Sequence, residues 1–309
     1  MRTILKSITI LLIILFISGC DKEHRHQIKV GMCQWPGYEP LFLAAKMNMF
    51  DEDIKMIRFS SPASAYKAFK SGAIDVVGLT SDEILKYADY GDVPKIFLVL
   101  DISDGADAIV AKPSIKTLKE IKGKRIALES STLAQHILHR ALDKVNLTTK
   151  DVDMVNIEIV EQPEAYTENK ADVFVTFEPS KSMMIKSGAN TIFDSSMIPN
   201  EIMDVLVSSK STWTNHKKSL DELKKAWYKT LDYINKNPKK AYEAMGELES
   251  ISGSDFEKSL EGIKYGTKDL NDKLITNKEI LVPLEKLQNI MLDKKILHNR
   301  INLSSILEK

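Results

Sequence analysis

The chain has 309 residues, of which 43% are hydrophobic and 28% charged, and its 43 basic residues balance its 43 acidic ones. This composition indicates a globular protein long enough for two compact lobes, and it excludes a disordered chain or a membrane channel. The charge balance also gives no sign of nucleic-acid binding, since Arg2 and Lys6 lie in an N-terminal leader and leave the rest slightly acidic.

Residues 1–19 have the pattern of a secretory signal peptide. A basic start precedes an apolar run, residues 8–17, that is too short to span a bilayer. Ile17, Ser18 and Gly19 then lead to Cys20, as in the bacterial lipobox, in which the cysteine is lipidated and becomes the new N-terminus. An ordinary signal peptide with an incidental cysteine is the alternative.

Residues 20–27 are polar and predict a short tether to a membrane surface. The expected location is therefore the outer face of the cytoplasmic membrane, and Asp21 resembles the signal that retains lipoproteins there in many double-membraned bacteria. With Cys20 in the anchor, Cys33 has no partner for an intramolecular disulfide. Because it ends an apolar strand, we interpret Cys33 as a buried small hydrophobe, not a nucleophile.

Residues 28–50 predict a strand, an aromatic loop and a helix. The loop presents Trp35 and Tyr38 where the strand passes to the helix, which is where open α/β sheets bind ligands. Pro36 restricts the backbone, and Gly37 is expected to permit a sharp reversal. In the alternative interpretation, Trp35 fills a core and Tyr38 covers it.

Two more strand–helix units follow, with strands at 54–59 and 72–80. Serines precede the helix that runs through residue 69, and Ser81 or Asp82 is expected to cap the helix 83–90. This places Thr80, Ser81 and Asp82 at the carboxyl end of a strand. Three such units predict a parallel sheet with helices on both faces.

The pattern restarts after a strand at 95–100 and an apolar run at 108–111. Strands are predicted at 122–128, 152–160 and 171–177, and helices at 133–145 and 164–169. Residues 72–80 and 170–178 share one order, a small residue, an acid and a hydrophobic strand, which suggests structural repetition between two lobes. Four amphipathic helices, at 220–236, 238–248, 255–263 and 280–292, are expected to pack back on the first lobe.

Residues 28–50, 72–80, 105–108, 118–127 and 172–179 together resemble the solute-binding proteins of ABC importers, in the branch of sulfonate, taurine, nitrate and thiamine-pyrimidine binders. The resemblance implies a type II periplasmic binding protein: two α/β lobes, each a mixed, mainly parallel sheet flanked by helices, with a ligand cleft between them. It implies a first lobe of residues 28–105 and 201–309 and an inserted second lobe of residues 106–200, with crossings near 105–111 and 199–207.

The resemblance also implies where the ligand binds. It points to four places where strand ends feed helices and N–H groups and hydroxyls converge. These are, in chain order, the first loop, the end of the third strand, the turn before the helix 133–145, and the acid that follows the strand 171–177. With Asp82 added as an acid beside the second place, the expected ligand-binding residues are Trp35, Tyr38, Thr80, Ser81, Asp82, Ser130, Ser131, Thr132 and Glu178. Plain helix capping is the alternative for Ser131 and Thr132, and a salt bridge is the alternative for Glu178.

The chain departs from the family pattern because no arginine stands at an obvious pocket position, which weakens a nitrate or simple sulfonate assignment. Two acids, Asp82 and Glu178, with two aromatic rings favour a ligand with an amine or a protonated nitrogen heterocycle. The expected protein is a monomeric lipoprotein that delivers a small ligand to an ABC permease and ATPase complex, with no cofactor, metal or nucleic-acid partner.

The sequence leaves two rival functions open. The lipoprotein could instead dock on a membrane sensor kinase or cyclase, because both kinds of partner would read the closed lobes. An exported enzyme is the other rival, but His136 and His139 lack the glutamate of a zinc peptidase motif, and His24 and His26 lie in the tether. No Ser/His/Asp order, P-loop or Gly-rich dinucleotide turn is present in the sequence.

Overall fold

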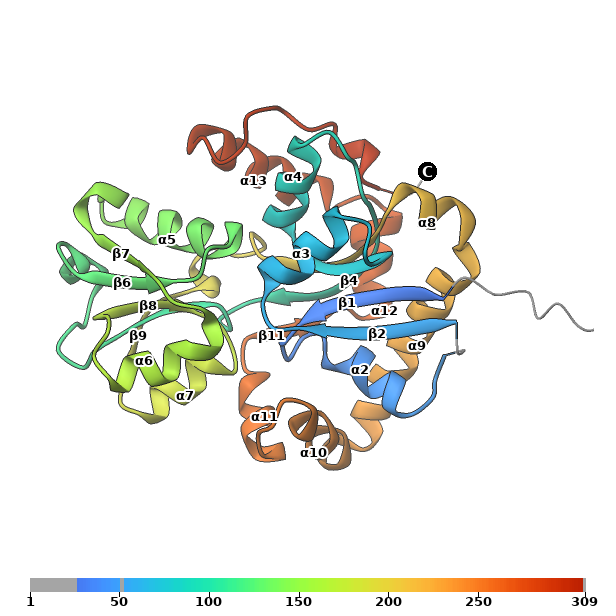
Figure 1. Cartoon of the computed structure of the whole chain (residues 1–309), viewed down its shortest axis with the longest axis horizontal. Coiled ribbons are helices and arrows are strands. Elements are labelled where there is room, and N and C mark those ends of the chain that lie inside the picture. Colours follow the sequence, from blue (N-terminus) through green and yellow to red (C-terminus); the bar gives the residue numbers. More distant parts are fainter. Residues whose placement is uncertain (1–26, 51–52, 308–309) are drawn as a thin grey trace, which may run out of the picture.

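Two β-sheets form two lobes that lie side by side in the computed structural model, which describes residues 27–50 and 53–307 (Figure 1). The predicted signal peptide, the lipidation site Cys20 and most of the tether lie outside the described residues. Within them, no helix combines the length and the apolar character needed to cross a bilayer.

The first sheet has the strand order β11-β4-β10-β3-β1-β2. Its strands are β1 (Ile28–Cys33), β2 (Ile54–Phe59), β3 (Val76–Thr80), β4 (Lys95–Ser103), β10 (Met203–Ser208) and β11 (Ile263–Tyr265). β1 pairs in parallel with β2 and β3, whereas β10 is antiparallel to both β3 and β4, and β11 is antiparallel to β4. Among the described strands of this sheet, β10 and β11 therefore run against the rest.

The second sheet has the order β7-β6-β8-β5-β9. Its strands are β5 (Ala108–Ala111), β6 (Arg125–Leu128), β7 (Asp153–Asn156), β8 (Val173–Thr176) and β9 (Asn190–Asp194). β5 is antiparallel to β8 and β9, while β6 is parallel to β7 and β8. Both sheets are thus mixed with most strands running one way, as predicted. β3 and β8 each separate a parallel strand from an antiparallel one, which fits the predicted repetition.

Helices cover both faces of each sheet (Figure 1). In the first lobe they are α2 (Glu39–Lys46), α3 (Pro62–Lys70), α4 (Ser81–Asp89), α8 (Lys210–Asn215), α9 (Lys217–Lys236), α10 (Pro238–Leu248), α11 (Gly253–Ser259), α12 (Lys268–Asn271) and α13 (Leu281–Asp293). In the second lobe they are α5 (Thr132–Lys144), α6 (Gln162–Thr167) and α7 (Ser180–Lys186). The C-terminal helices pack on the first lobe, as expected, since α9 and α10 contact α2 and α13 contacts α4.

The alternation of side chains along the strands explains the layers. In β3, Val76 belongs to the core beneath α2 and α9, whereas Val77 and Leu79 belong to the opposite core with α4 and α13. In β5, Ile109 packs toward α5, and Val110 belongs to the other core of this lobe, with residues of α6 and α7. Successive side chains of a strand point to opposite faces, so a wholly apolar strand is buried on both.

Some predicted elements need correction. Thr80 occupies the N-cap position of α4, so Ser81 and Asp82 are the first residues of the helix and not its caps. The strand predicted over 152–160 ends at Asn156, and a 3₁₀ turn (Ile159–Glu161) follows. β9, β11, α7 and α8 were not predicted, because each is short and has only a weak periodic pattern.

Candidate ligand-binding site

A pocket lies between the two lobes and contains about 360 Å³ of space free of protein atoms, part of it open to solvent. The ends of strands and the starts of helices from both sheets meet there. We call it the inner pocket, and its lining residues are Cys33, Trp35, Tyr38, Pro62, Gly78, Thr80, Glu83, Asp107, Leu133, Phe177 and Asp204. The predicted residues Trp35, Tyr38 and Thr80 are therefore brought together.

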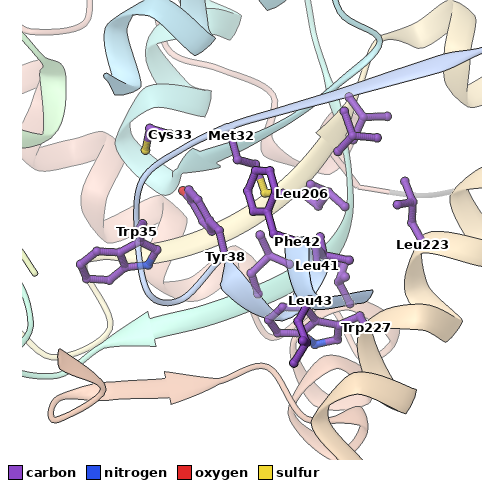
Figure 2. Close-up of a cluster of buried hydrophobic side chains, with 14 of the residues drawn as sticks. Met32, Cys33, Trp35, Tyr38, Leu41, Phe42, Leu43, Leu206, Leu223 and Trp227 are labelled. Carbon is purple, nitrogen blue, oxygen red and sulfur yellow. The ribbon is translucent and has the colours of Figure 1, made fainter. Parts of the chain in front are cut away.

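Trp35, in the β1–α2 loop, makes a hydrogen bond within its own lobe and a ring contact with the other lobe. Its indole Nε1 donates a hydrogen bond to Asp101 Oδ2 at 3.1 Å, and its ring meets Phe177 of the second lobe edge-on, with centroids 5.7 Å apart. The side chain is only 4% exposed and belongs to a large hydrophobic cluster, where it lies at the margin (Figure 2). Trp35 thus packs in the core and also lines the pocket.

Gly37 is needed for space and not for the backbone reversal that the sequence suggested. A Cβ built at this position would lie 2.0 Å from Asp101 Oδ2 and 2.3 Å from Trp35 Nε1. No left-handed φ is required there, since its φ does not lie among the positive values. The glycine therefore lets the carboxyl of Asp101 reach the indole N–H of Trp35.

A row of polar side chains crosses three strands beneath these rings. In the sheet register, Asp204 of β10 pairs with Thr80 of β3 on one side and with Asp101 of β4 on the other. The hydroxyl of Tyr38 donates a hydrogen bond to Asp204 Oδ1. Figure 2 shows the Tyr38 ring between Trp35 and Phe42. The row brings the buried carboxyl of Asp204 to the floor of the inner pocket, with Asp101 next to it in the sheet.

Burial dominates the ionisation of this row. It raises the pKa of Asp101 to about 8, with the Trp35 N–H acting in the opposite direction. Burial and the neighbouring Asp101 carboxyl raise the pKa of Asp204 as well. Two carboxyls this close cannot both hold a charge at neutral pH, so the pair titrates as a unit and retains a proton.

Two further acids line the inner pocket. Glu83 accepts the backbone N–H of Thr80 at 3.1 Å, and burial, followed by the charge of Asp82, raises its pKa to about 8. Asp107 lies just before β5, and burial raises its pKa to about 7. No lysine, arginine or histidine is among the lining residues. The pocket therefore concentrates acids with no lining cation to balance them.

Ser81 and Asp82 lie next to the inner pocket but are not among its lining residues. The hydroxyl of Ser81 donates to the Glu201 carbonyl at 3.0 Å and accepts the Met203 N–H at 3.3 Å, which ties α4 to the returning strand β10. Asp82 is fully buried, and burial raises its pKa while the nearby His136 of α5 lowers it. The acid that lines the pocket is the next residue in the chain, Glu83.

The serines before α5 are also separated. Ser130 is exposed, donates to Asn156 Oδ1 at 2.9 Å and lines a different hollow within the second lobe. Ser131 accepts the N–H of Ala134 at 3.1 Å and so caps α5, whose first residue is Thr132. From this junction only Leu133 lines the inner pocket. Ser131 therefore makes the contact expected of a helix cap, which is the alternative to ligand binding at this residue.

Glu178 follows β8 and is 1% exposed. Its Oε1 lies 3.2 Å from Lys181 Nζ, and its Oε2 accepts the N–H of Ser182 at 3.1 Å. Burial raises the pKa of Glu178 and Lys181 opposes this effect. Its carboxyl thus has partners within α7, while the preceding residue, Phe177, faces the inner pocket.

Cys33 is 6% exposed and lines the inner pocket, which confirms it as a buried residue. Burial, followed by the charges of Glu83 and Glu129, raises the pKa of its thiol. A thiolate is the nucleophilic form of cysteine, and these surroundings disfavour it. Cys33 therefore contributes shape and polarisability to the pocket wall.

The sequence profile of the NMT1-like family matches residues 21–247, well over half of the chain. The chain belongs to the NMT1-like family. A Haemophilus influenzae protein named for thiamine biosynthesis is 23% identical over 227 residues, which span 69% of this chain and 71% of that protein. The taurine-binding periplasmic protein of Escherichia coli K12 is 23% identical over 165 residues, 52% of each chain.

Solved structures of periplasmic binding proteins share the fold. The alkanesulfonate-binding protein SsuA of Xanthomonas axonopodis pv. citri, bound to MOPS, has a TM-score of 0.75 at 14% identity and covers 92% of this chain and 98% of its own. A ligand-binding component of an ABC-type import system from Staphylococcus aureus has a TM-score of 0.75 at 15% identity, with 91% and 96% covered. The resemblance inferred from the sequence is thus confirmed for family and fold.

Three buried acids at or next to the inner pocket of this NMT1-like chain were not predicted as site residues from the sequence. Asp204 interrupts an apolar strand, Asp101 follows directly on five apolar residues, and Glu83 is the neighbour of the predicted site residue Asp82. A lone acid within a strand that is otherwise buried is expensive unless it has a function or a partner. That signal was present in the sequence and would have pointed to Asp204.

Proposed function

We propose that this NMT1-like protein is a membrane-anchored, extracytoplasmic solute-binding lipoprotein that captures a small nitrogen-containing cation in the inner pocket and delivers it to an ABC permease. The observation that carries the proposal is the lining of the pocket, which holds the buried acids Glu83, Asp107 and Asp204 and no basic side chain. Charge pairing with a buried carboxylate favours a cationic ligand, and the rings of Trp35 and Tyr38 add cation–π attraction.

The chemistry of the relatives' ligands narrows the choice. Taurine and alkanesulfonates carry a sulfonate anion, which an ionised carboxylate in the pocket would repel. The relative named for thiamine biosynthesis points to an aminopyrimidine, whose ring nitrogen can take a proton and whose amino group can donate to a carboxylate. An aminopyrimidine is therefore the first compound to test.

The fold supports a capture-and-delivery role. The pocket is lined from both lobes, so ligand contacts on the two sides favour the closed arrangement. We further propose that residues 28–105 and 201–309 move as one lobe and residues 106–200 as the other. The anchor at Cys20 and the tether at residues 20–27 would keep the closed protein near the permease.

Isothermal titration of the purified protein with 4-aminopyrimidine, taurine and an alkanesulfonate tests the proposal. The aminopyrimidine is expected to bind and to be recovered unchanged, and the sulfonates are expected to bind weakly or not at all. Glu83→Gln should weaken aminopyrimidine binding by about 2–5 kcal/mol, as for removing one partner of a buried charged pair. Tighter binding of a sulfonate than of the base, in wild type, would reject the cationic-ligand assignment.

A further inference from the structure

The two carboxyls beneath Tyr38 are in contact with each other. Asp101 of β4 and Asp204 of β10 are paired across antiparallel strands, and their carboxyls are in hydrogen-bond contact. Opposite residues of neighbouring strands carry their side chains on the same face of the sheet, which brings such a pair together. Because a carboxylate has no hydrogen to donate, a hydrogen bond between two carboxyls requires that at least one of them carries a proton.

The other hydrogen bonds to this pair come from neutral donors. Trp35 Nε1 donates to Asp101 Oδ2 at 3.1 Å, and the hydroxyl of Tyr38 donates to Asp204 Oδ1. Asp101 is 0% exposed and Asp204 is 3% exposed, so water solvates a charge on either carboxyl poorly. A neutral donor does not displace a carboxyl proton as a neighbouring lysine or arginine would, and the pair therefore keeps its protons more readily.

The groups around the pair add negative charge and not positive charge. The titratable groups that surround the two carboxyls are acids, phenols and a thiol: Cys33 of β1, Tyr38 of the β1–α2 loop, Glu83 of α4, Asp107 before β5 and Tyr265 of β11. Two bases act on other acids nearby. Lys181 of α7 opposes the rise in the pKa of Asp107, and His136 of α5 opposes the rise in the pKa of Asp82. These surroundings favour the protonated form of the pair.

A ligand in the inner pocket therefore meets an acid that still holds its proton. Burial raises the pKa of Asp101 to about 8, and burial with the charge of Asp101 raises the pKa of Asp204 well above its ordinary value. Near neutral pH the pair thus keeps protons that ordinary aspartates have lost. Asp204 is the member of the pair that lines the pocket, so the ligand contacts its carboxyl.

We propose that the inner pocket binds a weakly basic nitrogen heterocycle that is uncharged in solution, and that Asp204 passes its proton to the ring nitrogen of the bound ligand. The O–H bond of Asp204 breaks, an N–H bond forms on the ring, and no proton is exchanged with solvent. Asp101 keeps its own proton and donates it to the new carboxylate of Asp204, beside the hydroxyl of Tyr38. The inference rests on the proposed function, because it takes a nitrogen base in the inner pocket as given.

The proton already present in the pocket determines the class of ligand. An amine that arrives as a cation meets a carboxylate only after a proton has left the buried acids for solvent, and this cost grows as the pH falls. A weak base brings no charge and takes up the proton where it binds. Trp35 and Tyr38 line the same pocket, so their rings lie beside the cation once it has formed.

The test compares two ligands of nearly the same shape on the full-length processed lipoprotein in detergent. 4-Aminopyrimidine is mainly uncharged at neutral pH, whereas 4-aminopyridine, in which C–H replaces one ring nitrogen, is mainly protonated. Titration calorimetry in buffers of different ionisation enthalpy counts the protons exchanged on binding. We expect close to none for 4-aminopyrimidine. For 4-aminopyridine we expect release of about one proton and an affinity that rises about tenfold per pH unit near neutrality.

A second measurement locates the proton. The ultraviolet difference spectrum of bound 4-aminopyrimidine should match that of the protonated base. Asp204→Asn keeps the shape of the side chain without its proton, and should weaken binding of 4-aminopyrimidine at least about tenfold and remove the proton release seen with 4-aminopyridine. Asp272→Asn is the matched control, since its side chain is 53% exposed and pairs with Lys268. It should behave as wild type in all of these measurements.

The outcomes separate the two proposals. Proton uptake with 4-aminopyrimidine, or no release with 4-aminopyridine, overturns the inference and leaves the cationic pocket standing, because either result shows that the acids are already ionised in the ligand-free protein. A spectrum of the neutral base for bound 4-aminopyrimidine overturns the proton transfer. These results come from wild type, so they hold even if Asp204→Asn fails to fold.

Two further outcomes count against the proposals. A folded Asp204→Asn variant with wild-type affinities and proton counts overturns the assignment of the donor to Asp204. If neither base binds, or if a sulfonate binds more tightly than both, the proposed function fails and the inference fails with it.

Discussion

At the scale of single residues, the contact between Trp35 and Asp101 shows how one hydrogen bond organises the site. The indole N–H reaches a carboxyl that burial otherwise leaves poorly solvated, and Gly37 leaves room for the approach. The same indole ring meets Phe177 across the cleft. Removing the hydrogen bond while keeping an aromatic ring therefore isolates its contribution.

Trp35→Phe is expected to lower the free energy of unfolding of the ligand-free protein by about 1–3 kcal/mol, because a buried acceptor loses its donor. Urea denaturation measures the change. Trp213→Phe, at a half-buried tryptophan in α8, makes the same chemical change outside the pocket lining. Equal losses in the two variants would show that ring size, and not the hydrogen bond to Asp101, accounts for the effect.

At the scale of elements, Glu201 joins three parts of the fold. Arg140 of α5 binds its carboxylate at 2.7 and 3.0 Å, Lys286 of α13 lies at 3.1 Å, and His136 of α5 at 3.2 Å. α5 belongs to the second lobe and α13 to the first, so this carboxylate links the lobes. Burial alone would raise the pKa of Glu201, but the three basic partners lower it to about 2.

This lowered pKa predicts a pH dependence with a definite sign. A glutamate in the unfolded chain has a pKa of about 4.3, so the network stabilises the folded state above that pH and is lost as pH falls toward about 2. Glu201→Gln should remove part of the fall in unfolding free energy between about pH 5 and pH 2. Denaturant titrations at several pH values compare it with wild type, and parallel curves would contradict the prediction.

The β11–β4 pairing is a second element-scale feature. Gly266 follows β11, and a Cβ there would lie 1.9 Å from the carbonyl oxygen of Val99 in β4. Its own carbonyl accepts the indole N–H of Trp227 at 2.8 Å. This edge of the first sheet therefore depends on a close approach of two backbones.

Gly266→Ala should destabilise the protein by on the order of 2–3 kcal/mol. The added methyl group must disrupt either the pairing of β11 with β4 or the hydrogen bond from Trp227. Thermal unfolding measures the loss. Gly72→Ala is a useful comparison, since nothing lies within 4 Å of its Cβ and only its positive φ is strained. A smaller loss for Gly266→Ala than for Gly72→Ala would contradict this account.

At the scale of the whole molecule, buried acids outnumber buried bases around the cleft. Burial is the main cause that raises the pKa of five carboxyls, to about 7 for Asp107 and Glu129, about 8 for Glu83 and Asp101, and about 9 for Glu249. The folded protein therefore holds protons that the unfolded chain releases near pH 4. Stability contributed by these groups is present at low pH and is lost as pH rises through 7 to 9.

The ligand-free protein should accordingly melt at a lower temperature at pH 9 than at pH 6. Calorimetry across this range checks the sign, and Glu83→Gln should flatten the slope because one of the titrating groups is removed. A saturating cationic ligand should also flatten it, since the cation offsets the charge of the deprotonated acids. A melting temperature that stays constant or rises with pH would contradict the prediction.

The proposed anchorage also concerns the whole protein, and its prediction depends on residues 17–20. Wild-type protein should partition into the detergent phase with an acylated N-terminus. Cys20→Ser should remain unprocessed or behave as a soluble protein. Mass spectrometry of the mature N-terminus decides the matter, and the absence of acyl mass on wild type would refute the lipoprotein assignment.

Most of the fold was predictable because its information is local. β2 begins and ends where the apolar pattern of residues 54–59 does, and Ser61 caps α3 as the serines before it suggested. Alternation and helical spacing report burial within one element, so strands and helices of ordinary length could be predicted. The aromatic loop of Trp35 and Tyr38 was predicted for the same reason.

The floor of the pocket depended on tertiary structure. Asp101 and Asp204 are about a hundred residues apart and meet only because β10 returns antiparallel beside β4. Whether Glu83 or Asp82 faces the pocket depends on the rotation of α4, which the N-cap at Thr80 sets. The sequence determined that strand ends would carry the site. Register and helix rotation, which arise from packing between distant segments, decided which acids line it.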